Sequence, residues 1–301
     1  MKVLVTGSNG LLGQKLTDLY TQQTHITLIA TARGANRHHS KKGYTYHQLD
    51  ITRKDEVDAV FSLYKPDVVI HTAAMTNVDA CELDHDACDA LNVNGVQNIV
   101  SACNTLGTHL IHLSTDFIFN GTHGPLTENE TPEPLSYYGH SKLKGEKLVQ
   151  SQSKSWAILR TVLVYGVVND MSRSNIVLWV KDSLENGKSI HVVGDQFRTP
   201  TLAEDLAMGC ALAAAKKAKG IYHISGGEFM SIFDIAYRVA DFWKLDKSLL
   251  NLSTSEGIKQ PAKRPPITGF SITKAKVELG YNPNSFTQGL DIIDSQLKNI
   301  S

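Results

Sequence analysis

The chain has 301 residues, and its 30 basic and 30 acidic side chains give a formal net charge of zero at pH 7. A balanced charge provides no field of one sign to attract nucleic acid or an acidic membrane, so neither is an expected partner. The length is sufficient for one large or two small domains with a sizeable core. The expected partners are therefore a small molecule and, in a homodimer, a second copy of the chain.

The four cysteines are interpreted as reduced thiols. Cys81, Cys88, Cys103 and Cys210 lack CxxC spacing and are too sparse for a disulfide scaffold. No cluster of zinc ligands is evident, so we expect no metal. The chain begins with MKVLVTGSNG, which enters a predicted strand without the charged region and apolar stretch of a secretory signal. This start predicts a cytoplasmic protein without a membrane span.

A glycine-rich motif follows the first predicted strand, at residues 2–6. The motif contains Gly7, Gly10 and Gly13, with Asn9 and Leu11 between them. Apolar residues then recur at helical spacing, so the strand, the turn and the helix form the first half of a dinucleotide-binding unit. The absence of glycine side chains lets a pyrophosphate reach the amides at the start of the helix.

The second predicted strand, residues 25–32, should end beside the adenosine ribose of a bound dinucleotide. No acidic residue lies between His25 and Gln48 to bind both ribose hydroxyls, and Arg33 directly follows the strand. An arginine there favours a 2'-phosphate, so NADP(H) is the preferred cofactor and NAD(H) the alternative. The rest of the basic, histidine-rich loop at 34–43 is interpreted as a solvated turn.

Strands and helices continue to alternate along the first half of the chain. Strands are predicted at 44–49, 67–72, 110–113 and 156–165, and helices at 53–64 and 85–106. This alternation predicts an α/β fold with a doubly wound, Rossmann-type parallel sheet. We assign residues 1–166 to a dinucleotide-binding domain. Residues 167–301 are assigned to a smaller, mostly helical substrate-binding lobe that is partly interleaved with it.

A tyrosine and a lysine four residues apart are candidates for proton transfer. Helical spacing would place Tyr138 and Lys142 on one face, about one turn apart. A neighbouring cation favours the phenolate and would bring the pKa of the tyrosine towards neutral pH. Ser114 and Thr115 end the strand predicted at 110–113 and would deliver hydroxyls to the same place.

These motifs resemble the extended short-chain dehydrogenase/reductase superfamily, which also has the GxxGxxG spacing. STDFIFNG at 114–121 and PLSYYGHSKLKGE at 134–146 are similar to STDYVFDG and PLNxYGxSKLxGE of the dTDP-4-dehydrorhamnose reductase family. The resemblance implies that Thr115, Tyr138 and Lys142 are catalytic, and that Tyr138 and Lys142 also contact the cofactor. Three residues depart from the family pattern, in which an aromatic residue, a tryptophan and a glycine are replaced by Met75, Leu163 and Arg198.

The resemblance implies further contacts. Asp50 and Ile51 match the position that contacts adenine, and an asparagine at 92 or 94 would support the active-site lysine through water. Ala73 and Ala74 are small residues where the backbone should pass close to the cofactor. The expected substrate contacts are Thr76, Asp116, Asn175 and Arg264, the last of which matches an arginine that faces the nucleotide diphosphate.

The implied reaction is the NADPH-dependent reduction of the C4 ketone of a 4-keto-6-deoxy sugar on a nucleoside diphosphate, as in dTDP-rhamnose synthesis. One alternative is a nucleotide-sugar epimerase or dehydratase, although these usually carry SSxxVYG, and dehydratases need an added acid–base pair. A second alternative is a non-catalytic, NADP-binding regulatory subunit, like the methionine adenosyltransferase beta subunit. The sequence leaves open the sugar, the nucleotide base and the oligomeric state.

Overall fold

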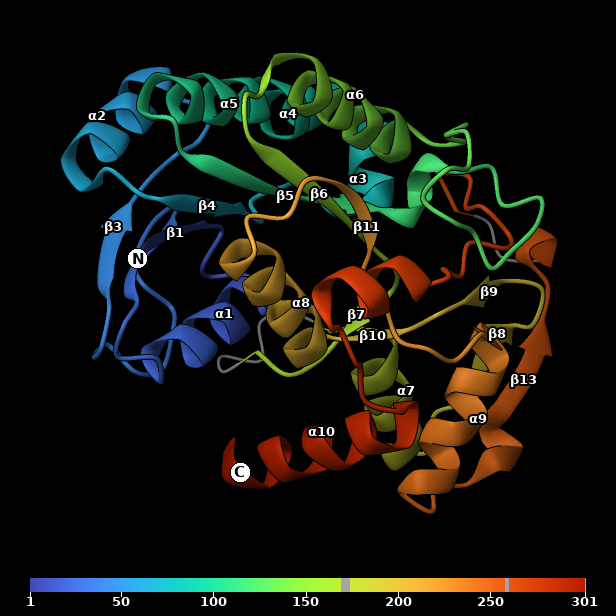
Figure 1. The fold of residues 1–301 in the computed structure, drawn as a ribbon. Helices are drawn as coiled ribbons and strands as arrows, with labels where there is room; N and C mark the ends of the chain where they lie inside the picture. Colours follow the sequence, from blue (N-terminus) through green and yellow to red (C-terminus); the bar gives the residue numbers. More distant parts are fainter. Residues whose placement is uncertain (169–173, 258–259, 301) are drawn as a thin grey trace.

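The computed structural model describes residues 1–168, 174–257 and 260–300, and its centre is a seven-stranded parallel sheet (Figure 1). The strand order is β11-β6-β5-β4-β1-β2-β3, so the chain winds outward from β1 in both directions. This order confirms the predicted doubly wound α/β fold. The strands are β1 (Lys2–Thr6), β2 (Thr27–Ala32), β3 (Thr45–Gln48), β4 (Val68–His71), β5 (His109–Thr115), β6 (Trp156–Thr161) and β11 (Gly220–His223).

Helices cover both faces of this sheet (Figure 1). One face carries α2 (Lys54–Tyr64), α5 (Gly95–Leu106) and α6 (Tyr137–Gln152), which pack side by side. The other face carries α1 (Leu11–Thr21) and α8 (Ala203–Ala215), which pack against each other. Every residue of β4 and β5 is buried, as expected for central strands with apolar helices on both sides.

Two predicted elements are divided in the structure. The helix predicted at 85–106 consists of α4 (His85–Asp89), a π-helical turn at Ala90–Asn94 and α5, and the short helix α3 (Val78–Leu83) precedes it. The strand predicted at 156–165 ends at Thr161, and Val164–Tyr165 form β7, which pairs with β10 (Thr201–Leu202) instead. Between them, Leu163 has a φ of 40°, which turns the chain away from the main sheet.

A second hydrophobic core lies within the carboxyl-terminal half of the chain. It is formed by buried apolar residues of α7 (Ile176–Glu185), β8 (Ile190–Val193), α9 (Ile232–Phe242) and α10 (Phe286–Ile300). The strands around it are short: β13 (Leu250–Ser253) pairs with β8, and β9 (Phe197–Arg198) pairs with β12 (Met230–Ser231). Short helical turns occur at Asp116–Ile118, Lys247–Leu249, Ser255–Gly257 and Ala275–Leu279.

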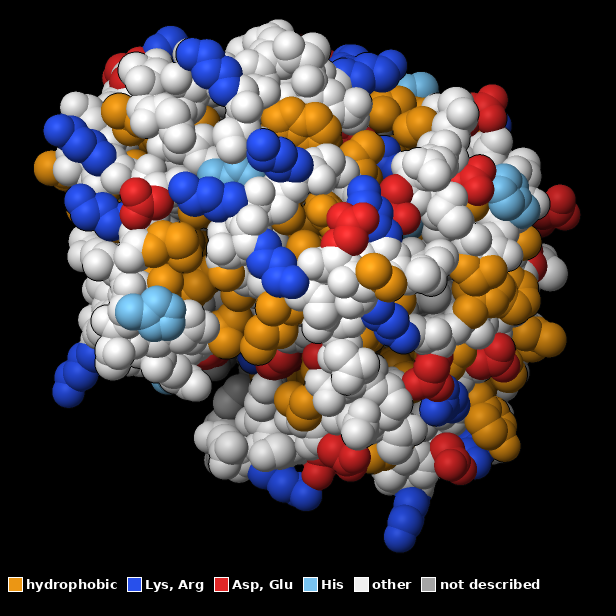
Figure 2. All heavy atoms as spheres, viewed as in Figure 1, with side chains coloured by type: hydrophobic (Ala, Val, Ile, Leu, Met, Phe, Trp, Pro, Cys, Tyr) orange, Lys and Arg blue, Asp and Glu red, His pale blue; other side chains and the backbone are white. Residues whose placement is uncertain are grey.

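On the face drawn in Figure 2, basic side chains predominate at the upper left, and basic and acidic side chains are interspersed toward the lower right. Small apolar patches lie between them. Within the described residues, no helix has both the length and the apolar character required to cross a membrane.

Candidate active site

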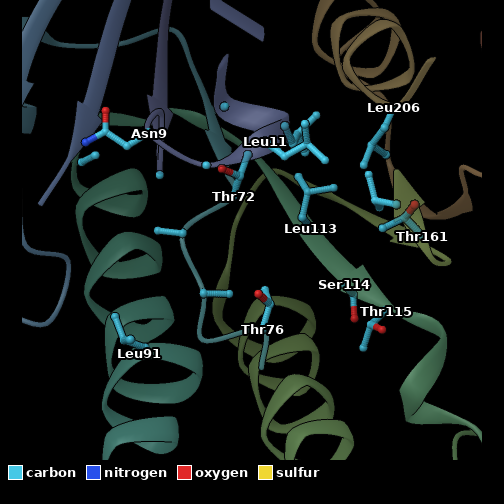
Figure 3. A pocket seen from close by; sticks show the side chains of 18 of the residues that line it. Asn9, Leu11, Thr72, Thr76, Leu91, Leu113, Ser114, Thr115, Thr161 and Leu206 are labelled. Atoms are coloured by element: carbon cyan, nitrogen blue, oxygen red, sulfur yellow. The ribbon is translucent and has the colours of Figure 1, made fainter. Parts of the chain in front are cut away.

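A cavity of about 590 Å³ lies at the carboxyl ends of the central strands (Figure 3). Its walls come from the turn after β1, the loop after β4, the end of β5 and helix α6. In Figure 3, Ser114 and Thr115 lie along the end of β5, across the cavity from Asn9. Doubly wound sheets bind ligands at this edge, where neighbouring connections leave in opposite directions.

The glycine turn leaves no room for side chains. Gly7 has a φ of 70°, and a Cβ atom on it would lie 2.8 Å from the backbone nitrogen of Ala73. A Cβ atom on Gly13 would lie 2.4 Å from the carbonyl oxygen of Gly7. Helix α1 begins after Gly10, and within the described part of the chain its first amide groups have no side-chain cap. Together with Leu11, which also lines the cavity, this turn fits a pyrophosphate.

The loop after β2 brings two arginines to the cavity. Arg33 and Arg37 are exposed and both line it, although sequence reasoning singled out only Arg33. Asn9 anchors the loop, since its Oδ1 accepts from the Arg37 backbone amide at 2.9 Å and its Nδ2 donates to the Ala35 oxygen at 2.9 Å. Asn9 and Arg37 are 28 positions apart, so local spacing does not indicate this contact.

The remaining predicted cofactor residues divide into two groups. Ile51, Ala73 and Ala74 line the cavity. Asp50 is not among the residues that line it, and its carboxylate accepts from the amide and the hydroxyl of Thr52 at 2.9 and 2.8 Å.

Helix α6 carries the candidate proton-transfer pair. Its first residue follows Ser136, whose hydroxyl accepts from the Gly139 amide at 3.3 Å and caps the helix. Tyr138 and Lys142 are both buried and both line the cavity, together with Thr115. The Lys142 ammonium donates to the Leu113 carbonyl oxygen at 2.7 Å, which ties the helix to the end of β5.

Burial controls the protonation of this pair. It raises the pKa of Tyr138 above the ordinary value for a phenol, against the opposing effect of a hydrogen bond with Thr115. The direction is opposite to the one expected from the spacing, because desolvation outweighs the hydrogen bond and the nearby Asp116 carboxylate also raises the pKa. Burial also lowers the pKa of Lys142 to about 8, while Glu146 opposes the shift. Tyr138 is thus protonated at neutral pH, which is the form that can donate a proton.

The predicted substrate residues have different surroundings. Thr76, Asp116 and Asn175 line the cavity. Asn175 also caps α7 through the Val177 and Leu178 amides and donates to the Gly166 oxygen at 2.7 Å. Arg264 is not among the lining residues, and it makes a two-pronged ion pair with Asp79 at 3.2 and 2.8 Å.

The π-helical turn positions Asn92, one of the two asparagines considered from the sequence. Its side chain accepts from the Met75 amide at 2.9 Å and donates to the Met75 oxygen and the Ser141 hydroxyl, both at 3.0 Å. It therefore joins the loop after β4 to helix α6. Asn94, in contrast, is exposed.

One group of potential metal ligands lies outside the glycine turn. Ligand atoms of Asp18, His38 and His39 lie within 4.8 Å of one another, and His38 Nε2 is 3.0 Å from an Asp18 oxygen. The contact between α1 and the histidine-rich loop could not be predicted from local sequence patterns. That the protein uses no metal remains a prediction.

The parallel sheet, the glycine turn and the Tyr138–Lys142 pair define an extended short-chain dehydrogenase/reductase. Residues 1–298 match the model of the RmlD substrate binding domain, and the chain belongs to that family.

Relatives with different names are similar to this chain. The chain is 31% identical to methionine adenosyltransferase 2 subunit beta of Mus musculus, over 85% of this chain and 76% of that protein. It is 30% identical to a dTDP-4-dehydrorhamnose reductase of Aggregatibacter actinomycetemcomitans, over 96% of this chain and 97% of that protein. Among solved structures, a dTDP-4-dehydrorhamnose reductase from Bacillus anthracis in complex with NADP has a TM-score of 0.84 at 26% identity, over 98% of this chain and 99% of that one.

Proposed function

We propose that this protein reduces the C4 ketone of a nucleotide-linked 4-keto-6-deoxy sugar, with NADPH as the reductant. The observation that carries the proposal is that Thr115, Tyr138 and Lys142 line the same cavity as the glycine turn. A hydride donor and a proton donor would then meet at one carbonyl group. The relatives named as dTDP-4-dehydrorhamnose reductases support this substrate class.

The residues present fit the cofactor. The turn at Gly7, Gly10 and Gly13 would hold the pyrophosphate, and a side chain at Gly7 or Gly13 would collide with the backbone that shapes this turn. Tyr138 and Lys142 would hold the nicotinamide ribose, and NADPH supplies a hydride when bound. Tyr138 donates its proton to the ketone oxygen. Lys142 then stabilises the resulting phenolate. Thr115 offers a hydroxyl group beside Tyr138.

Arg33 and Arg37 favour NADPH over NADH. A charge-assisted contact with the 2'-phosphate contributes roughly 1.5 to 3 kcal/mol, or about a ten- to hundredfold preference. Arg33→Ala should therefore weaken NADPH binding and leave NADH binding nearly unchanged. Titration of both cofactors measures this preference. Equal losses for the two cofactors would count against a phosphate contact.

The cavity favours a reductase over a dehydratase. A dehydratase needs an added acid and base, whereas Asp116 is the sole acidic residue among the described residues that line the cavity. Its carboxylate is also paired with Arg198, at 3.5 Å. A carboxylate held in such an ion pair is poorly placed to exchange protons with a substrate.

The regulatory-subunit alternative is supported by the 31% identity to methionine adenosyltransferase 2 subunit beta. NADPH oxidation by the purified protein, measured with a panel of dTDP- and UDP-linked 4-keto sugars, separates the two functions. A reductase consumes one NADPH for each sugar reduced, as checked by the mass of the product. NADPH binding without turnover of any sugar, together with co-purification of a partner protein, would instead support the regulatory function.

A further inference from the structure

A buried arginine lies directly behind the candidate active site. Arg198, in β9, is only 3% exposed and takes the place of a glycine in the family pattern. Burying its charge requires a partner of opposite charge and acceptors for all the N–H groups of the guanidinium. Nε faces Asp116 Oδ2 at 3.5 Å, Nη1 donates to the Phe197 and Pro266 oxygens at 2.8 and 2.9 Å, and Nη2 donates to the Pro265 oxygen at 2.7 Å and to Gln196 Oε1 at 3.4 Å.

The carboxylate of Asp116 connects this arginine to the catalytic hydroxyl. Asp116 is 2% exposed, and its Oδ1 accepts from the Thr115 hydroxyl at 3.1 Å. Its Oδ2 accepts from the Thr268 hydroxyl. Three segments that are distant in sequence therefore meet at one carboxylate: the end of β5, strand β9 and the segment 264–268.

These contacts also fix the direction of the hydrogen bonds at Thr115. Thr115 donates its proton to Asp116 and accepts from the Phe117 amide at 3.2 Å. The Thr115 hydroxyl also lies beside that of Tyr138, and the hydrogen bond between them lowers the Tyr138 pKa against the effect of burial. A charged Asp116 is required for this arrangement, since a protonated carboxyl would compete as a donor.

We propose that Arg198 is a positioning residue that links the segment 264–268, which carries Arg264, to the orientation of Thr115 beside Tyr138, through Asp116. The proposal rests on the proposed function, because Arg264 is the residue expected to contact the nucleoside diphosphate. In this arrangement the diphosphate-binding segment and the catalytic hydroxyl share one buried ion pair. Displacement of either one is transmitted to the other.

Arg198→Met tests the link, because it removes the charge and keeps an apolar stem. We expect KM for the keto sugar to rise and kcat to fall, each about tenfold, with NADPH affinity unchanged, since misplacement rather than lost chemistry is the defect. Without Arg198, burial favours the protonated form of Asp116. Activity of the variant should therefore increase with pH as Asp116 ionises, over a higher pH range than in the native protein, where Arg198 opposes the effect of burial on the Asp116 pKa.

A double substitution tests whether the link from Arg198 to Thr115 runs through Asp116. In Arg198→Met/Asp116→Asn the amide cannot titrate, so the added pH dependence should disappear, and the losses from the two substitutions should not add. Arg238→Met is the matched control, because Arg238 is also paired with a carboxylate, that of Glu228, which unlike Asp116 does not line the cavity. It should leave KM, kcat and the pH profile unchanged.

Calorimetric titration with dTDP tests the link without turnover. We expect Arg198→Met to bind dTDP about tenfold more weakly than the native protein does. If this variant does not fold, Thr268→Val removes one bond to Asp116 without unpairing a charge, and it should shift KM and dTDP affinity in the same direction. A native protein that binds dTDP but reduces no sugar contradicts the proposed function alone. Native-like dTDP affinity, KM, kcat and pH profile in a folded variant with only a lower melting temperature would overturn the positioning role.

Discussion

Tyr138 is the residue on which the proposed proton transfer depends. Tyr138→Phe keeps the ring and its packing but removes the acid, so turnover should fall by roughly 10²-fold or more while NADPH binding is nearly unchanged. Steady-state rates and a cofactor titration measure the two effects. Tyr137→Phe is the control, because Tyr137 stacks on His85 and is not a lining residue. Native turnover in Tyr138→Phe would remove this residue from the mechanism.

Lys142 makes the activity depend on pH. Its burial lowers its pKa to about 8, so the ammonium is present below that pH and is lost above it. We expect kcat/KM for NADPH, which reports on the free enzyme, to fall as the pH rises through about 8. In Lys144→Met this fall should persist, because Lys144 is paired with Asp89 on the exposed side of the helix. A flat profile up to pH 10 (about two units higher) would show that Lys142 does not titrate in the free enzyme.

For individual residues, the sequence predicts contacts between neighbours in the chain but not contacts between residues that are far apart in it. The shared face of Tyr138 and Lys142 follows from helix geometry alone. The contact of Arg264 with Asp79 joins residues separated by 185 positions, so no spacing could reveal it. Arg198 stood out as a departure from the family pattern, but its carboxylate partner depends on how β9 packs against the end of β5.

The glycine turn and helix α1 form one tightly packed element. Gly13→Ala would place a methyl group 2.4 Å from the Gly7 oxygen and 2.5 Å from the Ser8 Cα, so the helix must move away from the turn. We expect a loss of about 1–3 kcal/mol in the free energy of unfolding, and weaker NADPH binding. Urea unfolding and a cofactor titration measure these changes.

Gly227→Ala provides the comparison for that substitution. Gly227 is exposed, and the nearest atom to an added Cβ is 4.0 Å away. The Gly227→Ala variant should unfold at the same urea concentration as the native protein. If Gly13→Ala also kept native stability and NADPH affinity, the close approach at the turn would have no functional role.

The predicted elements agree with the structure where hydrophobic patterns are short and bounded by turns. β1 matches its prediction at residues 2–6, and α2 begins one residue later than predicted. The segment 156–165 is apolar except for Arg160 and Thr161, and its pattern does not show the turn at Leu163. The π-helical turn at Ala90–Asn94 was also missed, because it keeps the helical path and changes only the hydrogen bonding.

For the whole molecule, the class of fold was predictable but the assembly of its parts was not. Alternating strands and helices indicate a doubly wound sheet. That β11 returns to pair with β6, and that α8 packs on α1, depends on contacts between residues far apart in the chain. The boundary near residue 166, with a second part that is partly interleaved with the first, stays a prediction.

The central claim is that this cavity transfers a hydride to a sugar carbonyl while Tyr138 supplies the proton. The most direct test is to incubate the protein with a nucleotide-linked 4-keto-6-deoxy sugar and NADPH that carries deuterium at the transferable position, and to analyse the product by mass spectrometry and NMR. Transfer of one deuterium to C4 is the predicted result, with Tyr138→Phe giving little product. Reduced sugar without deuterium, or deuterium at another carbon, would contradict the account.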